Sequence, residues 1–231
     1  MGNSPQENRL SMAMENYLLS IIRLEEQNIV VTITRLSEHF KELPKGEGLG
    51  TSMPSVSAML KRMAREKLVV TDPSKEIHLT DIGRVSAESI LRRHRLAKKL
   101  VVDVLKVDLP QSHEEAHRLE HAISPYLENK IVDLLGNPTT CPFGHPIPGS
   151  SYEAKDGLLT LDEAKVGSSY IVDRLPEDDR ELLEYFVGNG FLPGSNFSVT
   201  DCSIPRGIIT LSCDEKELVF SLSISALIWV Y

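Results

Sequence analysis

Apolar residues return every three or four positions through much of the first 135 residues, a period that predicts α-helices. Between two of these segments, 68–70 and 77–79 are short apolar runs around an Asp-Pro-Ser-Lys turn, which predicts a hairpin. Thr34 is the expected N-cap of the second helix, and 44–50, with three glycines and a proline, is an expected loop. Ser112, with Glu115 three residues later, predicts a capping box. The helical segments are 11–27, 34–43, 52–66, 81–103, 113–121 and 124–135.

A different pattern follows residue 135. Residues 136–157 hold four prolines and four glycines, which predicts a linker or an extended ordered segment. Beyond it, short apolar runs alternate with turns, and one acidic helical insert is expected at 178–187. This pattern predicts a small β-barrel of SH3-like size, so the fold class is α+β. The apolar runs are 158–161, 169–172, 197–200, 207–211, 217–222 and 227–231.

The order helix, helix, loop, helix, hairpin in the first 79 residues is that of a winged helix-turn-helix. The third helix presents small hydroxyls near its start and basic residues further along, a combination suited to phosphates and base edges. The alternative is a small helical subdomain with a charged surface. The predicted DNA contacts are Ser52, Pro54, Ser55, Ser57, Lys61 and Arg62.

The charge distribution favours DNA binding. The 231-residue chain has a net charge of −8, yet residues 52–99 hold eleven Lys or Arg against five Asp or Glu. A basic segment on an acidic protein is a local electrostatic footprint for nucleic acid. No apolar run is long enough to span a membrane, and three cysteines without a CxxC pair argue against a disulfide framework. We therefore expect a cytoplasmic protein.

The segment 113–121 carries the most distinctive chemistry. At about 100° per residue, His113, His117, Glu120 and His121 fall on one helix face. Imidazole and carboxylate groups together suit manganese, iron or zinc. The alternatives are a solvated face that happens to carry histidines, and a zinc metallopeptidase. In the latter, residues 117–121 match H-x-x-E-H and Glu120 acts as general base.

Blocks along nearly the whole chain resemble the diphtheria toxin repressor family of metal-dependent transcriptional repressors. Their joint order is more specific than any block alone. The blocks are Met14-Glu15-Asn16-Tyr17-Leu18, Pro54-Ser55-Val56-Ser57, Leu79-Thr80-Asp81-Ile82-Gly83-Arg84, His94-Arg95-Leu96, His117-Arg118-Leu119-Glu120-His121, residues 137–149, Gly190-Phe191-Leu192-Pro193-Gly194-Ser195 and Ala226-Leu227-Ile228-Trp229-Val230.

The resemblance implies a winged-helix DNA-binding domain at 1–79, a helical dimerisation and metal-binding domain at 80–149, and a linker with an SH3-like, FeoA-type domain at 150–231. It implies a homodimer that, loaded with Fe²⁺ or Mn²⁺, binds double-stranded operator DNA, represses transcription and controls metal homeostasis. The metallopeptidase alternative leaves both the winged-helix order and the basic segment without an explanation.

The resemblance also implies two metal sites. The primary ligands are Asn16, His117, Glu120 and His121. Asn16 stands where relatives have Met or Asp, and His117 where they have Cys or Glu. The implied ancillary ligands are His94, His113 and Asp179, and Lys98 stands where the family pattern has a glutamate. A protonated lysine cannot ligate a metal ion, so the ancillary site is open to question from the sequence.

Overall fold

The computed structural model describes residues 10–43, 49–177 and 179–231, apart from the side chain of Glu42. The greater part of the expected loop at 44–50, and the first residue of the expected insert at 178–187, lie outside the described residues. The chain divides into two compact units, residues 1–92 and 93–231. Each unit is described by itself below.

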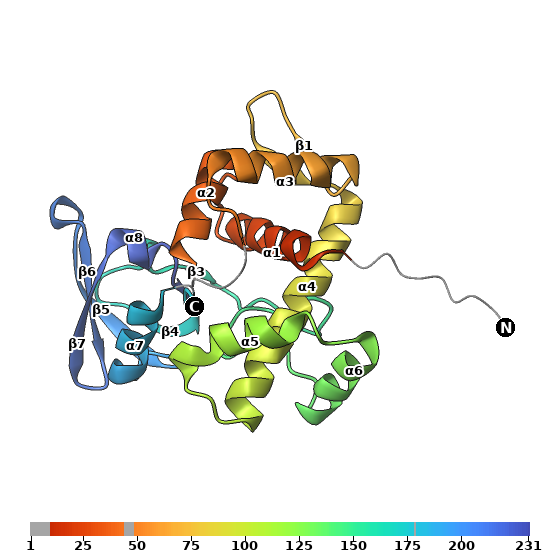
Figure 1. The fold of residues 1–231 in the computed structure, drawn as a ribbon. Helices are drawn as coiled ribbons and strands as arrows, with labels where there is room; N and C mark the ends of the chain where they lie inside the picture. Colours follow the sequence, from red (N-terminus) through yellow and green to blue (C-terminus); the bar gives the residue numbers. More distant parts are fainter. Residues whose placement is uncertain (1–9, 44–48, 178) are drawn as a thin grey trace. The chain divides into compact units, whose positions relative to one another are not determined.

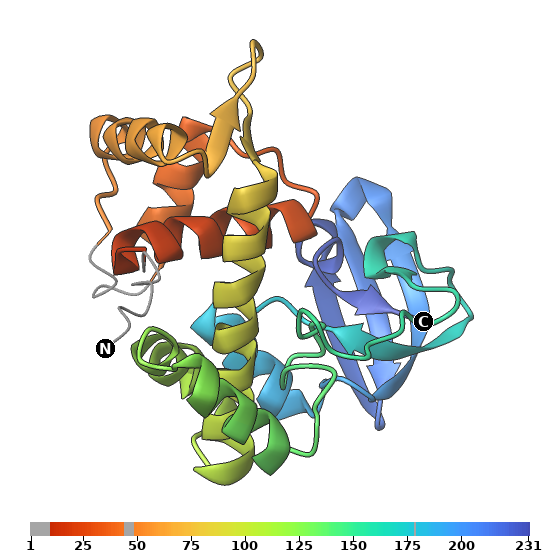
Figure 2. The same ribbon diagram turned by 90° about the vertical axis from the view of Figure 1, so that its right-hand side faces the viewer.

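The first unit is a winged helix-turn-helix (Figure 1). The antiparallel strands β1 and β2 form the expected hairpin, the wing. Both Figure 1 and Figure 2 place the wing beside α3, on the far side of α3 from α1. The elements are α1 (Met12–Glu26), α2 (Ile33–Glu42), α3 (Met53–Arg65), β1 (Val69–Thr71), β2 (Ile77–Leu79) and the first three turns of α4 (Asp81–Lys99).

Side-chain caps fix where these helices begin. Ser52 accepts a hydrogen bond from the backbone N–H of Ser55, and Pro54 occupies the first turn of α3, where its missing N–H costs nothing. The N-cap predicted for α2 was wrong by two residues. Thr32, not Thr34, is the N-cap and accepts from the N–H of Arg35 at 3.1 Å. Thr32 has the extended backbone that a cap requires, whereas Thr34 already lies within the helix.

The wing is joined to α4 by a close backbone approach. Thr80 donates to the carbonyl of Lys67 and accepts from the N–H of Gly83, which holds the first turn of α4 against the segment before β1. A Cβ at Gly83 would lie 1.8 Å from the carbonyl oxygen of Leu68. Glycine is therefore required at this position for the hairpin and α4 to meet.

The second unit begins with a helical part. The rest of α4, residues 93–99, continues into a π-helical turn, Leu100–Val104, and α5 (Ser112–Glu120) and α6 (Pro125–Leu134) follow. The helix predicted at 113–121 is present, but its predicted capping box is wrong. Ser112 donates its hydroxyl to the carbonyl of Leu109 and has helical backbone angles, because a 3₁₀ turn leads directly into α5.

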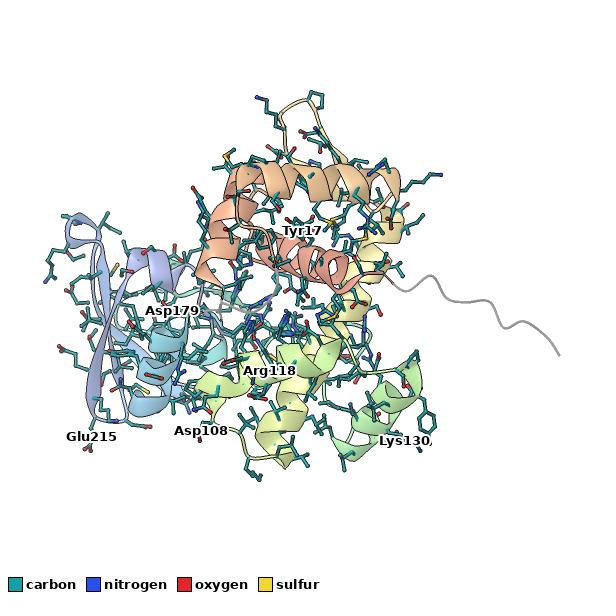
Figure 3. The ribbon with its side chains drawn as sticks, in the orientation of Figure 1. Tyr17, Asp108, Arg118, Lys130, Asp179 and Glu215 are labelled. Atoms are coloured by element: carbon teal, nitrogen blue, oxygen red, sulfur yellow. The ribbon has the colours of Figure 1, made fainter. Side chains whose placement is uncertain are left out.

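The rest of the second unit is the expected small β-structure. Its six strands are antiparallel in the order β3-β8-β4-β5-β6-β7, which confirms the α+β class. The turn between β6 and β7 has two consecutive residues of positive φ, Asp214 and Glu215, and Figure 3 labels Glu215 at its tip. The elements are β3 (Leu159–Thr160), β4 (Ser169–Arg174), α7 (Arg180–Asn189), β5 (Asn196–Ser203), β6 (Ile208–Cys213), β7 (Lys216–Ser221), α8 (Leu222–Ser225) and β8 (Trp229–Val230).

The Pro/Gly segment before β3 is ordered in its first half. Cys141 and Phe143 are buried in the same apolar core as Leu175 and Phe186 of the β-domain. The carbonyl of Phe143 accepts from the N–H of Leu175 at 3.0 Å. Of the two alternatives for this segment, the structure therefore shows extended ordered chain here, packed on the β-domain.

Candidate metal centre and nucleic-acid interface

The polar face predicted for 113–121 forms on α5. The imidazole rings of His113 and His117 are parallel, with centroids 6.5 Å apart, and the ring of His121 lies 5.3 Å from that of His117. Arg118, labelled in Figure 3, is exposed on the same helix and pairs with Glu114 and Glu115. The side chains of His117 and Arg118 thus point in different directions from α5, because neighbouring positions on a helix do not face each other.

Glu120 is the centre of the face. Its side chain is fully buried, and its Oε2 accepts a hydrogen bond from Nδ1 of His94 on α4. Its Oε1 lies 2.9 Å from Nδ1 of His117 and 3.4 Å from Nε2 of His121. Burial alone would raise the pKa of Glu120, but His94 and His117 outweigh it and lower that pKa below its ordinary value. Glu120 is therefore an ionised carboxylate.

This arrangement fits a divalent transition metal. One ligand atom each from His117, Glu120 and His121 lies within 4.8 Å of the other two. Two imidazoles and a carboxylate form a donor set for manganese, iron or zinc. The fully buried His94 holds the carboxylate from behind, as partners of metal ligands commonly do. Within the described ranges, the one other group of this kind is Asp72, Glu76 and His78 in the wing, where none of the three side chains is buried.

Two of the remaining predicted ligands belong to other elements of the chain. Asn16 lies on α1, in the first unit, and is buried there. Asp179 is exposed at the start of α7, where it caps the helix by accepting from the N–H of Leu182 at 3.0 Å. The structure brings the rings of His94 and His113 to 5.3 Å of each other. It does not bring Asp179 to them within ligand distance in the part of the chain it describes.

Sequence reasoning missed the partner of Lys98. Lys98 is fully buried, and its Nζ lies 2.8 Å from Oε2 of Glu177, just before α7. The available signal was a lysine within the inward-facing pattern of α4, since a buried lysine needs an acidic partner. Burial, which the charge of Lys98 reinforces, lowers the pKa of His94 to about 3, so that imidazole is neutral.

The predicted DNA-contact residues share the outer face of α3. All are exposed except Ser57, which is half-buried, and the inward face carries Val56, Leu60 and Met63. Arg62 makes an exposed ion pair with Glu66 at 3.5 Å. Such a pair contributes little and exchanges readily for a phosphate. The exposed residues are Ser52, Pro54, Ser55, Lys61 and Arg62.

Comparisons with known proteins agree with this architecture. The family described as "Iron dependent repressor, N-terminal DNA binding domain" matches residues 9–77. "Iron dependent repressor, metal binding and dimerisation domain" matches 80–149, and "FeoA domain" matches 159–231. None of the helices in the described part of the chain is long and apolar enough to cross a membrane.

Individual relatives cover most of the chain. The iron-dependent repressor IdeR of Mycobacterium bovis is 35% identical over 225 residues, which cover 92% of this chain and 93% of that protein. The diphtheria toxin repressor of Corynebacterium diphtheriae is 35% identical over 155 residues, 67% of this chain and 60% of that protein. A solved manganese-dependent transcriptional repressor in complex with manganese is 28% identical with a TM-score of 0.81, covering 94% of this chain and 98% of that one.

A winged helix, a helical part with a buried His/Glu/His group and a FeoA-type domain define the class of metal-dependent transcriptional repressors. The chain belongs to the iron-dependent repressor family, which includes the diphtheria toxin repressors. Members of this family bind DNA, dimerise and are not enzymes, so the metallopeptidase interpretation of 117–121 is set aside.

Proposed function

We propose that this chain is a repressor activated by Fe²⁺ or Mn²⁺ at a site formed by Asn16, His117, Glu120 and His121. The observation that carries the proposal is the position of Glu120 Oε1, between the two imidazoles of α5. The relatives that it resembles are named iron-dependent and manganese-dependent repressors. An amide oxygen with two imidazoles and a carboxylate suits either metal.

The proposed ligands come from two parts of the chain, so that metal binding can switch the DNA-binding unit between arrangements. A bound metal ion would supply the positive charge and coordination bonds that join the α5 group to the ligand on α1. His94 keeps the Glu120 carboxylate ionised and oriented before the ion arrives. Asn16 contributes the ligand from the DNA-binding unit, so metal binding favours one arrangement of that unit and shifts the population toward it.

DNA is bound through α3 in a dimer. The outer face of α3, from Ser52 to Arg62, enters the major groove of operator DNA in the cytoplasm, and two copies place their α3 helices on successive turns. The dimer forms through apolar residues of the helical domain that the single chain leaves exposed, Tyr126, Leu127 and Leu134 of α6. In this proposal the DNA-binding domain ends near residue 79 and the dimerisation domain ends near residue 149.

The test is a DNA-binding titration against genomic fragments with Mn²⁺, anaerobic Fe²⁺, Zn²⁺ or chelator. Wild type should bind in the presence of Fe²⁺ or Mn²⁺ and lose binding in chelator. His121→Ala should abolish the metal response and leave the metal-free circular dichroism spectrum unchanged. Arg118→Ala, an exposed residue of α5 that pairs with Glu114 and Glu115, is the matched control and should keep the response. A wild-type response in His121→Ala would overturn the proposal.

A further inference from the structure

A buried ion pair links α4 to the β-domain. The ammonium of Lys98 lies 2.8 Å from Oε2 of Glu177, and the two side chains are 0% and 3% exposed. The ammonium also lies 5.2 Å from the centre of the Phe143 ring. A charge withdrawn from water this far is stable only when paired, so each of the two residues depends on the other.

The pair lies in a cluster of metal-binding types of side chain. Cys141 Sγ is 3.9 Å from the same Glu177 oxygen, and burial raises the pKa of Cys141 to about 11, so it is a neutral thiol. His94 precedes Lys98 by one turn of α4, and its Nε2 is buried without a hydrogen-bond partner in the described structure. The ring of His113 is 5.3 Å from that of His94. A carboxylate, a thiol and an imidazole one helical turn away therefore neighbour a cation that the chain itself supplies.

An ancillary metal ion does not fit this cluster. Among the described residues, the Glu120 carboxylate is held by His94 and His117, Glu177 is already paired with Lys98, and Asp179 is used as a helix cap at the surface. A divalent ion ligated by His94 would lie close to the Lys98 ammonium and be repelled by it. The expected ancillary set of His94, His113 and Asp179 is therefore at odds with the chemistry of the residues present.

We propose that the Lys98 ammonium takes the place of a second metal ion and fastens the FeoA-type domain to α4 through Glu177. The attachment is permanent and needs no metal. The metal ion at α5 is then the one metal signal, a role that rests on the proposed function above.

Metal counting tests the absence of a second ion. The full chain is dialysed against Mn²⁺, and bound manganese per protomer is measured by elemental analysis. Lys98→Glu places a carboxylate beside His94, His113 and Glu177 and should gain one ion relative to wild type. Lys99→Glu, the same charge change at the adjacent residue, should gain none. Because the gain is a difference, it is expected even if wild type binds no ion at α5, which distinguishes this proposal from the proposed function.

Removing His113 tests whether the additional ion of Lys98→Glu is bound at this cluster. His113→Ala should leave the wild-type count unchanged and remove the additional ion from Lys98→Glu. Loss of an ion from wild type on His113→Ala, or no gain in Lys98→Glu, would overturn the proposal. Where Lys98→Glu does not fold, the labelling measurement below decides.

Thiol labelling tests the attachment itself. Cys141 is buried beside the ion pair, whereas Cys202 is partly exposed and serves as an internal reference. In chelator, Cys141 of wild type should react many-fold more slowly than Cys202, as read by mass spectrometry. Lys98→Met and Glu177→Gln should each accelerate it at least tenfold, and the exchange Lys98→Glu with Glu177→Lys should restore protection. Protection of wild-type Cys141 that requires Mn²⁺ would show that metal, not lysine, holds the domain.

Discussion

His94 on α4 donates its Nδ1 hydrogen to Oε2 of Glu120 on α5, and both side chains are fully buried. The bond fixes the plane of the carboxylate, so its other oxygen is presented to the imidazoles of His117 and His121. His94 thus acts on the metal site through Glu120, as a positioning residue.

The first prediction tests that bond. In a histidine's place, an asparagine amide nitrogen reaches roughly where Nδ1 was, and a glutamine amide nitrogen where Nε2 was. His94→Gln should therefore weaken metal binding about 10- to 100-fold, the range found for partners of metal ligands. His94→Asn should keep most of the affinity. Calorimetric titration with Mn²⁺ measures both, and equal losses in the two variants would contradict the positioning role.

The second prediction concerns Asn16. Its removal should raise the Mn²⁺ or Fe²⁺ concentration needed for half-maximal DNA binding about tenfold, one lost ligand's share of affinity. Its effect on the free energy of unfolding without metal should be smaller, because the α5 group does not need it to form. Fluorescence anisotropy with labelled DNA and urea denaturation give the two numbers for Asn16→Ala. A large loss of stability with an unchanged metal requirement would make Asn16 a structural residue.

The third prediction concerns Arg62. Arg62→Ala should weaken DNA binding and reduce the slope of log affinity against log salt by about 0.9, the contribution of one phosphate contact. Arg206→Ala provides the control, since Arg206 also makes an exposed ion pair, with Asp201, in the β-domain. The measurement is a set of binding isotherms at four salt concentrations. An unchanged slope in Arg62→Ala removes this residue from the DNA interface.

The fourth prediction concerns the dimer. Leu134 is 64% exposed on α6, and Leu134→Arg should raise the dimer dissociation constant at least about tenfold by placing a charge in an apolar contact. Val219, on β7 and 44% exposed, gives a matched control: Val219→Arg should leave dimerisation unchanged. Analytical ultracentrifugation distinguishes the two. A stable Leu134→Arg dimer would place the interface elsewhere.

The fifth prediction is acid sensitivity of the metal-free chain. The pKa of His94 is about 3 in the folded chain and about 6.5 when unfolded. Between these values the unfolded chain binds a proton that the folded chain does not, so stability is lost as pH falls below 6.5. From pH 6.5 to 5 the loss at this residue is about 2 kcal/mol. Glu120, whose pKa is also lowered, adds to the loss only below its ordinary range.

Urea denaturation at the two pH values measures this loss. His94→Asn carries no titrating imidazole at this position and should show a correspondingly flatter dependence. If wild type and His94→Asn lose the same stability between pH 6.5 and 5, the acid sensitivity arises elsewhere.

Local patterns were sufficient for the elements and for part of the site. Residues 113, 117, 120 and 121 share a helix face because helix geometry alone decides it, and the capacity to bind a metal ion follows from the residue types of His117, Glu120 and His121. The six helical segments and eight short strands were predicted for the same reason, since each rests on a pattern of apolar residues over a few positions. The residue that caps a helix was harder to predict from the sequence. Thr32 and Thr34 are both capable caps, and backbone conformation selected the first.

Only the tertiary structure decided which polar groups meet across the fold. The bonds from His94 to Glu120 and from Lys98 to Glu177 join elements far apart in sequence, and no periodicity relates them. From the sequence, Lys98 indicated only that an ancillary site was in doubt, and Asp179 was as good an acid as any near it. Burial made the difference: Lys98 is withdrawn from water and needs an anion, and folding brings Glu177 to it while leaving Asp179 at the surface.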